Sequence, residues 1–218
     1  MRTMMKHFLP FTFLTLLATA PVAFAQNWEV GVGGGGNFYT SQTFTNPAGS
    51  ASAKLASGFI VSAWLDNNSS GPFGGELRYD YEHTDLKLSS GGTSASFGGA
   101  QTNAIHYDAV LHFAPRESRV VPYVTGGVGI KDYSGTGTEQ VFQPLSDIAL
   151  LTKTSQFKPL VVVGGGIKFQ VASNVTFRVE VHDFLTPFPD KVIAPALGSK
   201  VGGWLSDFTA MAGISFSF

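Results

Sequence analysis

Charged and histidine side chains recur at every second position in several stretches of the chain. These residues are Glu76, Arg78, Asp80 and Glu82; His106, Asp108 and His112; Lys168; and Arg178, Glu180 and His182. Such groups can form ion pairs with one another, or an imidazole beside a carboxylate can act as a general base. His106 with Asp108, and His182 with Asp183, fit the second description, but no serine stands beside either pair in a recognisable motif.

The residues between these charged positions are apolar. Leu77 and Tyr79 separate the acidic and basic residues of one stretch, and Phe177 and Val179 do so in another. Side chains of a β-strand alternate between two faces, so this period of two places the charges on one face and the apolar groups on the other. The enrichment in valine, phenylalanine and tyrosine also favours strands over helices.

Eight segments follow this alternating pattern and predict an all-β chain. They cover residues 27–39, 53–66, 73–88, 102–114, 119–132, 157–171, 174–185 and 204–218. Each has the length of a tilted membrane strand, which needs roughly 9 to 11 residues to cross the bilayer. In the second segment Trp64 falls on the less apolar face, which does not fit the pattern cleanly.

The connections between these segments alternate in length. Short turns are expected at 67–72, 115–118 and 172–173, and long loops at 40–52, 89–101, 133–156 and 186–203, with a short helix over 147–152. Outer-membrane barrels have short periplasmic turns and longer external loops, and an even number of strands returns both chain ends to the periplasm. The sequence therefore predicts an eight-stranded antiparallel up-and-down transmembrane β-barrel.

Such a barrel would enclose the charged faces. An interior formed by eight strands is only wide enough for side chains, and buried charges are costly unless they are paired. We therefore expect the charged residues named above to form a network in the lumen. Aromatic girdles are expected at both interfaces, with Tyr39, Tyr107 and Phe184 near the external one. Runs such as 33–36 and 164–166 are glycines, which we interpret as allowing close packing within a narrow lumen.

The two ends of the chain carry targeting features. Residues 1–25 combine basic Arg2 and Lys6, an apolar core and the small residues Ala23 and Ala25 before Gln26, which predicts a cleaved signal peptide and a barrel domain over 26–218. The last strand ends on Phe216 and Phe218, with Gly213 before them. Its apolar face suits lipid, and pairing with the first strand would leave no free edge.

Composition excludes several classes of protein. The chain has no cysteine, so it is neither a disulfide scaffold nor a cysteine-linked lipoprotein, and its formal net charge of −1 without a basic run argues against nucleic-acid binding. Only 13% of the residues are charged, which would leave a soluble domain short of polar cover. A secreted soluble β-sandwich or lipocalin-like carrier remains an alternative.

The chain resembles the small outer-membrane β-barrel proteins of Gram-negative bacteria, a group that includes the OmpA membrane domain, OmpX and OmpW. The resemblance lies in three stretches, residues 121–129, 165–180 and 211–218. The last is similar to the C-terminal signal read by the barrel assembly machinery and supplies Gly213, Phe216 and Phe218. Met211 departs from that signal, because the position is usually polar.

This resemblance implies a porin-like integral protein of the cell outer membrane, in contact with lipid and lipopolysaccharide. We expect a non-enzymatic monomer with a structural or surface-interaction role, a lumen closed by its charges and loops open to an external ligand. A narrow solute channel and a lipid A-modifying barrel enzyme are the alternatives. The glycine runs are followed by strand and not by the helix of a phosphate-binding loop, which argues against a dinucleotide site. We expect no cofactor and no metal.

Overall fold

The structure is a computed structural model that describes residues 28–40, 42–46, 49–55, 57–68, 71–90, 93–135, 149–152, 154–195 and 203–218. The predicted signal peptide, with Ala23 and Ala25, lies outside the described residues.

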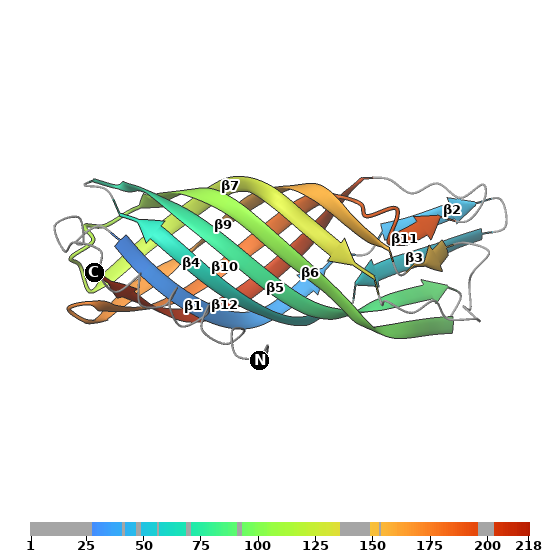
Figure 1. Cartoon of the computed structure of the whole chain (residues 1–218), viewed down its shortest axis with the longest axis horizontal. Coiled ribbons are helices and arrows are strands. Elements are labelled where there is room, and N and C mark those ends of the chain that lie inside the picture. Colours follow the sequence, from blue (N-terminus) through green and yellow to red (C-terminus); the bar gives the residue numbers. More distant parts are fainter. Residues whose placement is uncertain are drawn as a thin grey trace, which may run out of the picture.

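Eight long strands form a closed barrel (Figure 1). They are β1 (Trp28–Tyr39), β4 (Gly58–Asn67), β5 (Phe73–Ser90), β6 (Thr93–His112), β7 (Val120–Ser134), β9 (Ser155–Ala172), β10 (Val175–Pro187) and β12 (Trp204–Ser217). Each strand pairs antiparallel with the barrel strands before and after it in the chain, and β12 pairs with β1 to close the ring. The predicted eight-stranded antiparallel up-and-down barrel is confirmed.

The two ends of the barrel differ. We call one the turn end, because it holds the connections 68–72, 113–119 and 173–174, and there the Phe218 amide donates to the Trp28 carbonyl at 3.1 Å. The opposite end, the loop end, carries four short strands: β2 (Gln42–Asn46), β3 (Gly49–Leu55), β8 (Ala149–Leu151) and β11 (Ile193–Pro195). The strand labels β2, β3 and β11 mark this end in Figure 1.

Three details of the sequence prediction are wrong at the loop end. Residues 40–52 are not simply a loop, because β2 and β3 lie there and β3 extends the sheet beside β5. The loop predicted over 89–101 is mostly strand, since β5 and β6 remain paired up to Ser90 and Thr93. Residues 149–151 form β8, which pairs with β11, instead of part of a helix. Backbone pairing between strands decided each case, and the pairs β3–β5 and β8–β11 join residues far apart in the chain, which local sequence does not encode.

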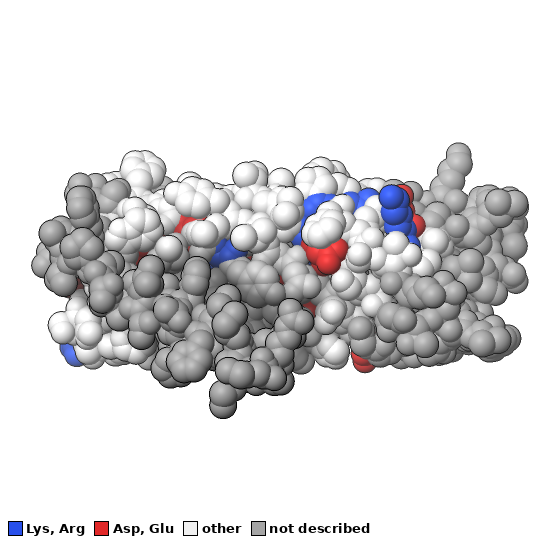
Figure 2. Space-filling model, in the orientation of Figure 1, with Lys and Arg blue, Asp and Glu red and all other residues white. Residues whose placement is uncertain are grey.

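The wall separates apolar from charged side chains as the alternation predicts. Outward residues such as Tyr107, Val128 and Phe216 are exposed, whereas the charged residues between them are buried. On the face shown in Figure 2, the described surface is largely uncharged, and the largest coloured patch lies toward the loop end. An exposed apolar band around a closed barrel suits a lipid environment. Separately, no helix among the described residues is long and apolar enough to cross a membrane.

Glycines on the inner face make room for Trp64, the residue that did not fit the alternation. Its indole is buried in the lumen, on the inner face of β4. A Cβ atom on Gly31 would lie 2.3 Å from this ring, and one on Gly213 would lie 2.4 Å from it. No real Cβ contact is that close, so β1 and β12 must carry glycine at these positions for the indole to lie flat against the wall.

Three of the aromatic residues expected near the external interface lie elsewhere. Tyr39 and Phe184 are buried inside the barrel and not in a girdle. Tyr107 faces outward, but it pairs with Leu77 and lies over Gly75, close to Trp28 and the turn end. The prediction failed for two reasons. Tyr39 and Phe184 face inward, where their rings contact the buried ammonium group of Lys131. The position of Tyr107 along the barrel depends on strand register, which the sequence pattern does not give.

Substitution of Gly213 by alanine should destabilise the barrel by about 1–3 kcal/mol, because the added Cβ overlaps the buried Trp64 ring and the carbonyl of Val32. Gly36→Ala is the matched control, since its Cβ would meet only ordinary contacts at 3.7 Å or more. Urea-induced unfolding in lipid vesicles measures both. Equal stability of the two variants would contradict the account of Gly213.

Candidate functional site: the charged interior of the barrel

The lumen is filled with ionisable side chains. The residues predicted for it are all buried: Glu76, Arg78, Asp80, Glu82, His106, Asp108, His112, Lys168, Arg178, Glu180 and His182. Sequence reasoning missed four further buried charges: Glu29, Asp66, Lys131 and Asp207. Asp66 and Asp207 share the inward parity of their strands and could have been found in that way. Lys131 follows Gly127 and Gly129, which have no side chains to reveal the alternation.

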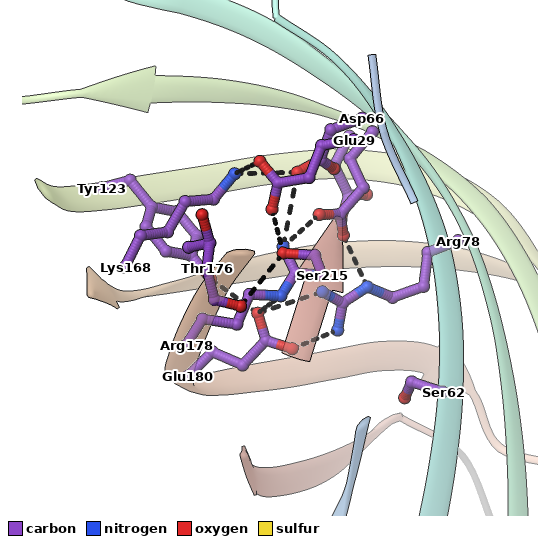
Figure 3. Close-up of polar contacts among 12 residues, drawn as sticks. Glu29, Ser62, Asp66, Arg78, Tyr123, Lys168, Thr176, Arg178, Glu180 and Ser215 are labelled. Carbon is purple, nitrogen blue, oxygen red and sulfur yellow. Dashed lines mark hydrogen bonds and ion pairs between the residues drawn. The ribbon is translucent and has the colours of Figure 1, made fainter. Parts of the chain in front are cut away.

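Two arginines and two glutamates join opposite sides of the barrel. Arg78 Nη1 and Nη2 donate to the two carboxylate oxygens of Glu180 at 2.7 and 3.0 Å, and Arg178 Nη1 donates to Glu76 Oε2 at 2.7 Å. Arg78 Nε also donates to Glu76 Oε1 at 2.5 Å. Glu76 and Arg78 come from β5, whereas Arg178 and Glu180 come from β10, which lies opposite β5 in the ring. Figure 3 shows the side chains of Arg78, Arg178 and Glu180 converging in the lumen. We call this group the arginine cluster.

Trp64 provides a face for both arginines. The guanidinium carbon of Arg178 lies 3.4 Å from the centre of the indole ring, and that of Arg78 lies 5.1 Å from it. A cation over an indole face is attracted by the ring quadrupole, and this attraction is larger where water is excluded. The indole therefore stabilises two buried cations, whose N–H groups donate to carboxylates.

A lysine lies between the arginine cluster and the turn end. Lys168 Nζ donates to Asp66 Oδ2 at 2.8 Å and to Glu29 Oε2 at 3.2 Å. The Ser215 hydroxyl donates to the other oxygen of Glu29. Tyr123 lies beside this group and donates to Glu180 Oε2 at 2.6 Å, which connects the lysine to the arginine cluster.

A histidine lies in the middle of the lumen. His106 Nε2 is 2.8 Å from Asp80 Oδ2, and its Nδ1 is 2.7 Å from Asp108 Oδ1, so carboxylates hold both ring nitrogens. The Ser62 hydroxyl donates to Asp80 and not to His106. The serine is therefore not hydrogen-bonded to the histidine, as a histidine-activated nucleophile would be. The imidazole of His182, stacked on Phe184, has no hydrogen-bond partner among the described residues.

A second lysine lies in the interior toward the loop end. Lys131 Nζ donates to Glu82 at 2.9 and 3.1 Å and to Asp207 Oδ2 at 2.5 Å. Glu82 also accepts from Thr102 at 2.9 Å and from the Tyr39 hydroxyl. The rings of Tyr39, Tyr133 and Phe184 surround the ammonium group, with centres 5.1–5.5 Å away. A fully buried lysine is thus supplied with both carboxylates and aromatic faces.

The described interior contains acidic and histidine groups, but no set of three or more of them is arranged to hold a metal ion. Its chemistry is ion pairing across the lumen.

At the loop end, the segment 188–195 is fastened to β9. Asp190 Oδ1 accepts from Lys158 Nζ at 2.7 Å and from Gln156 Nε2 at 3.1 Å, while the Lys191 amide donates to Gln156 Oε1 at 2.9 Å. The hydrogen bond from Lys158, followed by that from Gln156, holds the pKa of Asp190 below its usual range. Behind this contact, Val192 and Ile193 are buried.

A closed barrel with an apolar outer band and a paired, charged interior defines an integral outer-membrane β-barrel protein. A family model described as outer membrane protein beta-barrel domain matches residues 11–216, and the chain belongs to this family. It is a protein of the Gram-negative outer membrane. By the usual arrangement of such barrels, the turn end faces the periplasm and the loop end faces outward.

Solved structures show the same fold at low sequence identity. Neisserial surface protein A is 14% identical, with a TM-score of 0.52, and the match covers 88% of this chain and 97% of that one. The outer membrane protein OprG from Pseudomonas aeruginosa is 12% identical, with a TM-score of 0.55 and coverage of 89% and 97%. No curated protein matches the chain significantly in sequence.

Substitution of Arg178 by alanine should destabilise the barrel by about 3–5 kcal/mol, because it leaves the buried carboxylate of Glu76 with one cation fewer. Unfolding in urea, followed by tryptophan fluorescence in lipid vesicles, measures the loss. Arg119→Ala, at an exposed position of the turn end, is the control and should change stability little. Equal effects of the two substitutions on the free energy of unfolding would show that the arginine cluster does not stabilise the barrel.

The stability of the contact between segment 188–195 and β9 should depend on pH. The pKa of Asp190 is lower in the folded protein than in the unfolded chain. Its carboxylate therefore stabilises the segment above the unfolded pKa of about 4, and this stabilisation is lost as the pH falls through the folded pKa. We expect the hydrogen-exchange protection of the Val192 and Ile193 amides, which donate to the Pro189 carbonyl at 3.0 Å, to fall in acid. Asp190→Asn should lower this protection at neutral pH and remove its pH dependence. Unchanged protection in that variant would refute the role of Asp190.

Proposed function

We propose that this protein is a non-enzymatic outer-membrane barrel whose lumen is closed to solutes and which acts through its loop end. The arginine cluster is the observation that carries the proposal. Its four ion-paired residues extend from opposite walls and meet inside the barrel, with Arg78 and Arg178 fully buried. A solute could pass only by separating these charges, which is costly when each would be left unpaired.

The two lysine groups support the same proposal. Lys168 toward the turn end and Lys131 toward the loop end each bind carboxylates from other strands. A solute would have to cross these contacts as well as the arginine cluster. A lumen closed in this way leaves the outer surface and the loop end for interaction with lipopolysaccharide or an external ligand.

The alternative of a lipid A-modifying enzyme is less well supported. Such a reaction needs an activated nucleophile or base within reach of a lipid headgroup. His106 and His182 are both buried in the lumen, and Asp80 and Asp108 occupy the ring nitrogens of His106. Asp183, proposed as a partner for His182, instead accepts from the Ser206 hydroxyl at 2.5 Å.

Two steps of biogenesis belong to the proposal. We infer that the signal peptide is removed after Ala25 and that the barrel assembly machinery reads the last strand. Phe216 on the outer face of β12 and Phe218, the residue after this strand, are exposed, so another protein can reach them. The glycine at position 213 is explained by the structure, because a side chain there would overlap Trp64.

Single-channel recording of the purified, refolded protein tests the closed lumen. The wild type should show no steady conductance, whereas Arg178→Ala combined with Lys131→Ala should produce openings, because each substitution removes a cation that joins strands across the lumen. Slower gel mobility after heating shows that the double variant is still folded. A steady wild-type conductance would refute the proposal and favour the narrow solute channel.

A further inference from the structure

The turn end contains a cavity that the charged network does not fill. Its volume is about 720 Å³, and its polar lining includes Glu29, Asn68, His112, Arg116, Lys168 and Gln170. Arg116 comes from the β6–β7 turn, whereas Lys168 and Glu29 form the boundary with the closed interior. We call this space the turn-end cavity. It lies outside the Lys168 contacts, so it is open to the periplasm whether or not the lumen conducts.

The buried acid in the cavity lining already has its hydrogen-bond donors. Glu29 accepts from Ser215 through one carboxylate oxygen, and from Lys168 and Asn68 through the other, both at 3.2 Å. A cationic ligand would have to displace these donors. Glu29 therefore offers little to a positively charged group, and Glu117, the second acid of the lining, is exposed to solvent.

Hydrogen-bond donors, in contrast, are in excess. Arg116 Nη2 donates to the Phe73 carbonyl at 2.8 Å, but its Nε and Nη1 have no acceptor among the described residues and are shielded from solvent. Lys168 uses two acceptors, Glu29 and Asp66, for an ammonium group that carries three N–H donors. An unsatisfied guanidinium N–H costs free energy that an incoming acceptor would recover.

We propose that the turn-end cavity binds an oxyanion, a carboxylate or a phosphate, presented from the periplasm. Arg116 is the main binding residue, and Lys168 provides a second positive charge at the inner wall of the cavity. Charged oxygen acceptors form the strongest hydrogen bonds with such donors. A free solute and the phosphate of an inner-leaflet lipid share this chemistry. The proposal goes beyond the closed-lumen function, because it concerns the opposite end of the protein from the loops.

Calorimetric titration of the purified protein in a phosphate-free detergent, with inorganic phosphate and acetate as probes, tests the site. Arg116→Gln should weaken binding about tenfold, the usual effect of losing a hydrogen bond to a charged group. Arg119→Gln is the matched control: it removes the same charge from the same turn, but Arg119 does not line the cavity. Glu117→Gln, which removes a negative charge from the lining, should strengthen binding.

A second titration, in nanodiscs with and without phosphatidylglycerol, identifies the source of the oxyanion. Loss of soluble-probe binding only when the anionic lipid is present would indicate that the lipid phosphate occupies the cavity. Equal weakening by Arg116→Gln and Arg119→Gln would overturn the proposal, because general positive charge would then explain binding. No binding of either probe, with or without the anionic lipid, would also overturn it. Heat-dependent gel mobility confirms that each variant is folded, and conductance separates this test from that of the closed lumen.

Discussion

Ion pairing across the lumen is the constraint on which the rest of this structure depends. Glu76 and Arg78 on β5 meet Arg178 and Glu180 on β10, a strand on the opposite side of the ring. Buried charges of this kind are tolerated only when each finds its partner. The pairs therefore fix which residues of the two strands lie at the same height, and the apolar residues between them must face lipid.

The arginine cluster also explains the glycines of the barrel. Trp64 lies beneath both guanidinium groups, and it fits there because Gly31 and Gly213 leave space for its ring. The strands β1 and β12 thus carry glycine where the large side chain of Trp64 on β4 packs. Packing, cation–π contact and ion pairing are satisfied together, and a change in one disturbs the others.

The two ends of the barrel are built for different surroundings. At the turn end, short connections leave a cavity lined by Arg116 and Lys168, facing the periplasm. At the loop end, β5 and β6 stay paired up to Ser90 and Thr93, and the segment 188–195 contacts β9 through Asp190. The ion-paired interior lies between these two surfaces.

Alternation with a period of two was enough to predict the barrel, because it reports which face of each strand meets lipid. It also determined that charges such as Arg178 and Glu180 point inward. It did not determine their partners, since strand register and the approach of opposite walls depend on closure of the whole ring. For the same reason it predicted wrong positions for Tyr39 and Phe184. It did not reveal Lys131, because the glycines before it on the same strand have no side chains that show the alternation. Only the tertiary structure decided that these residues surround one another in the lumen.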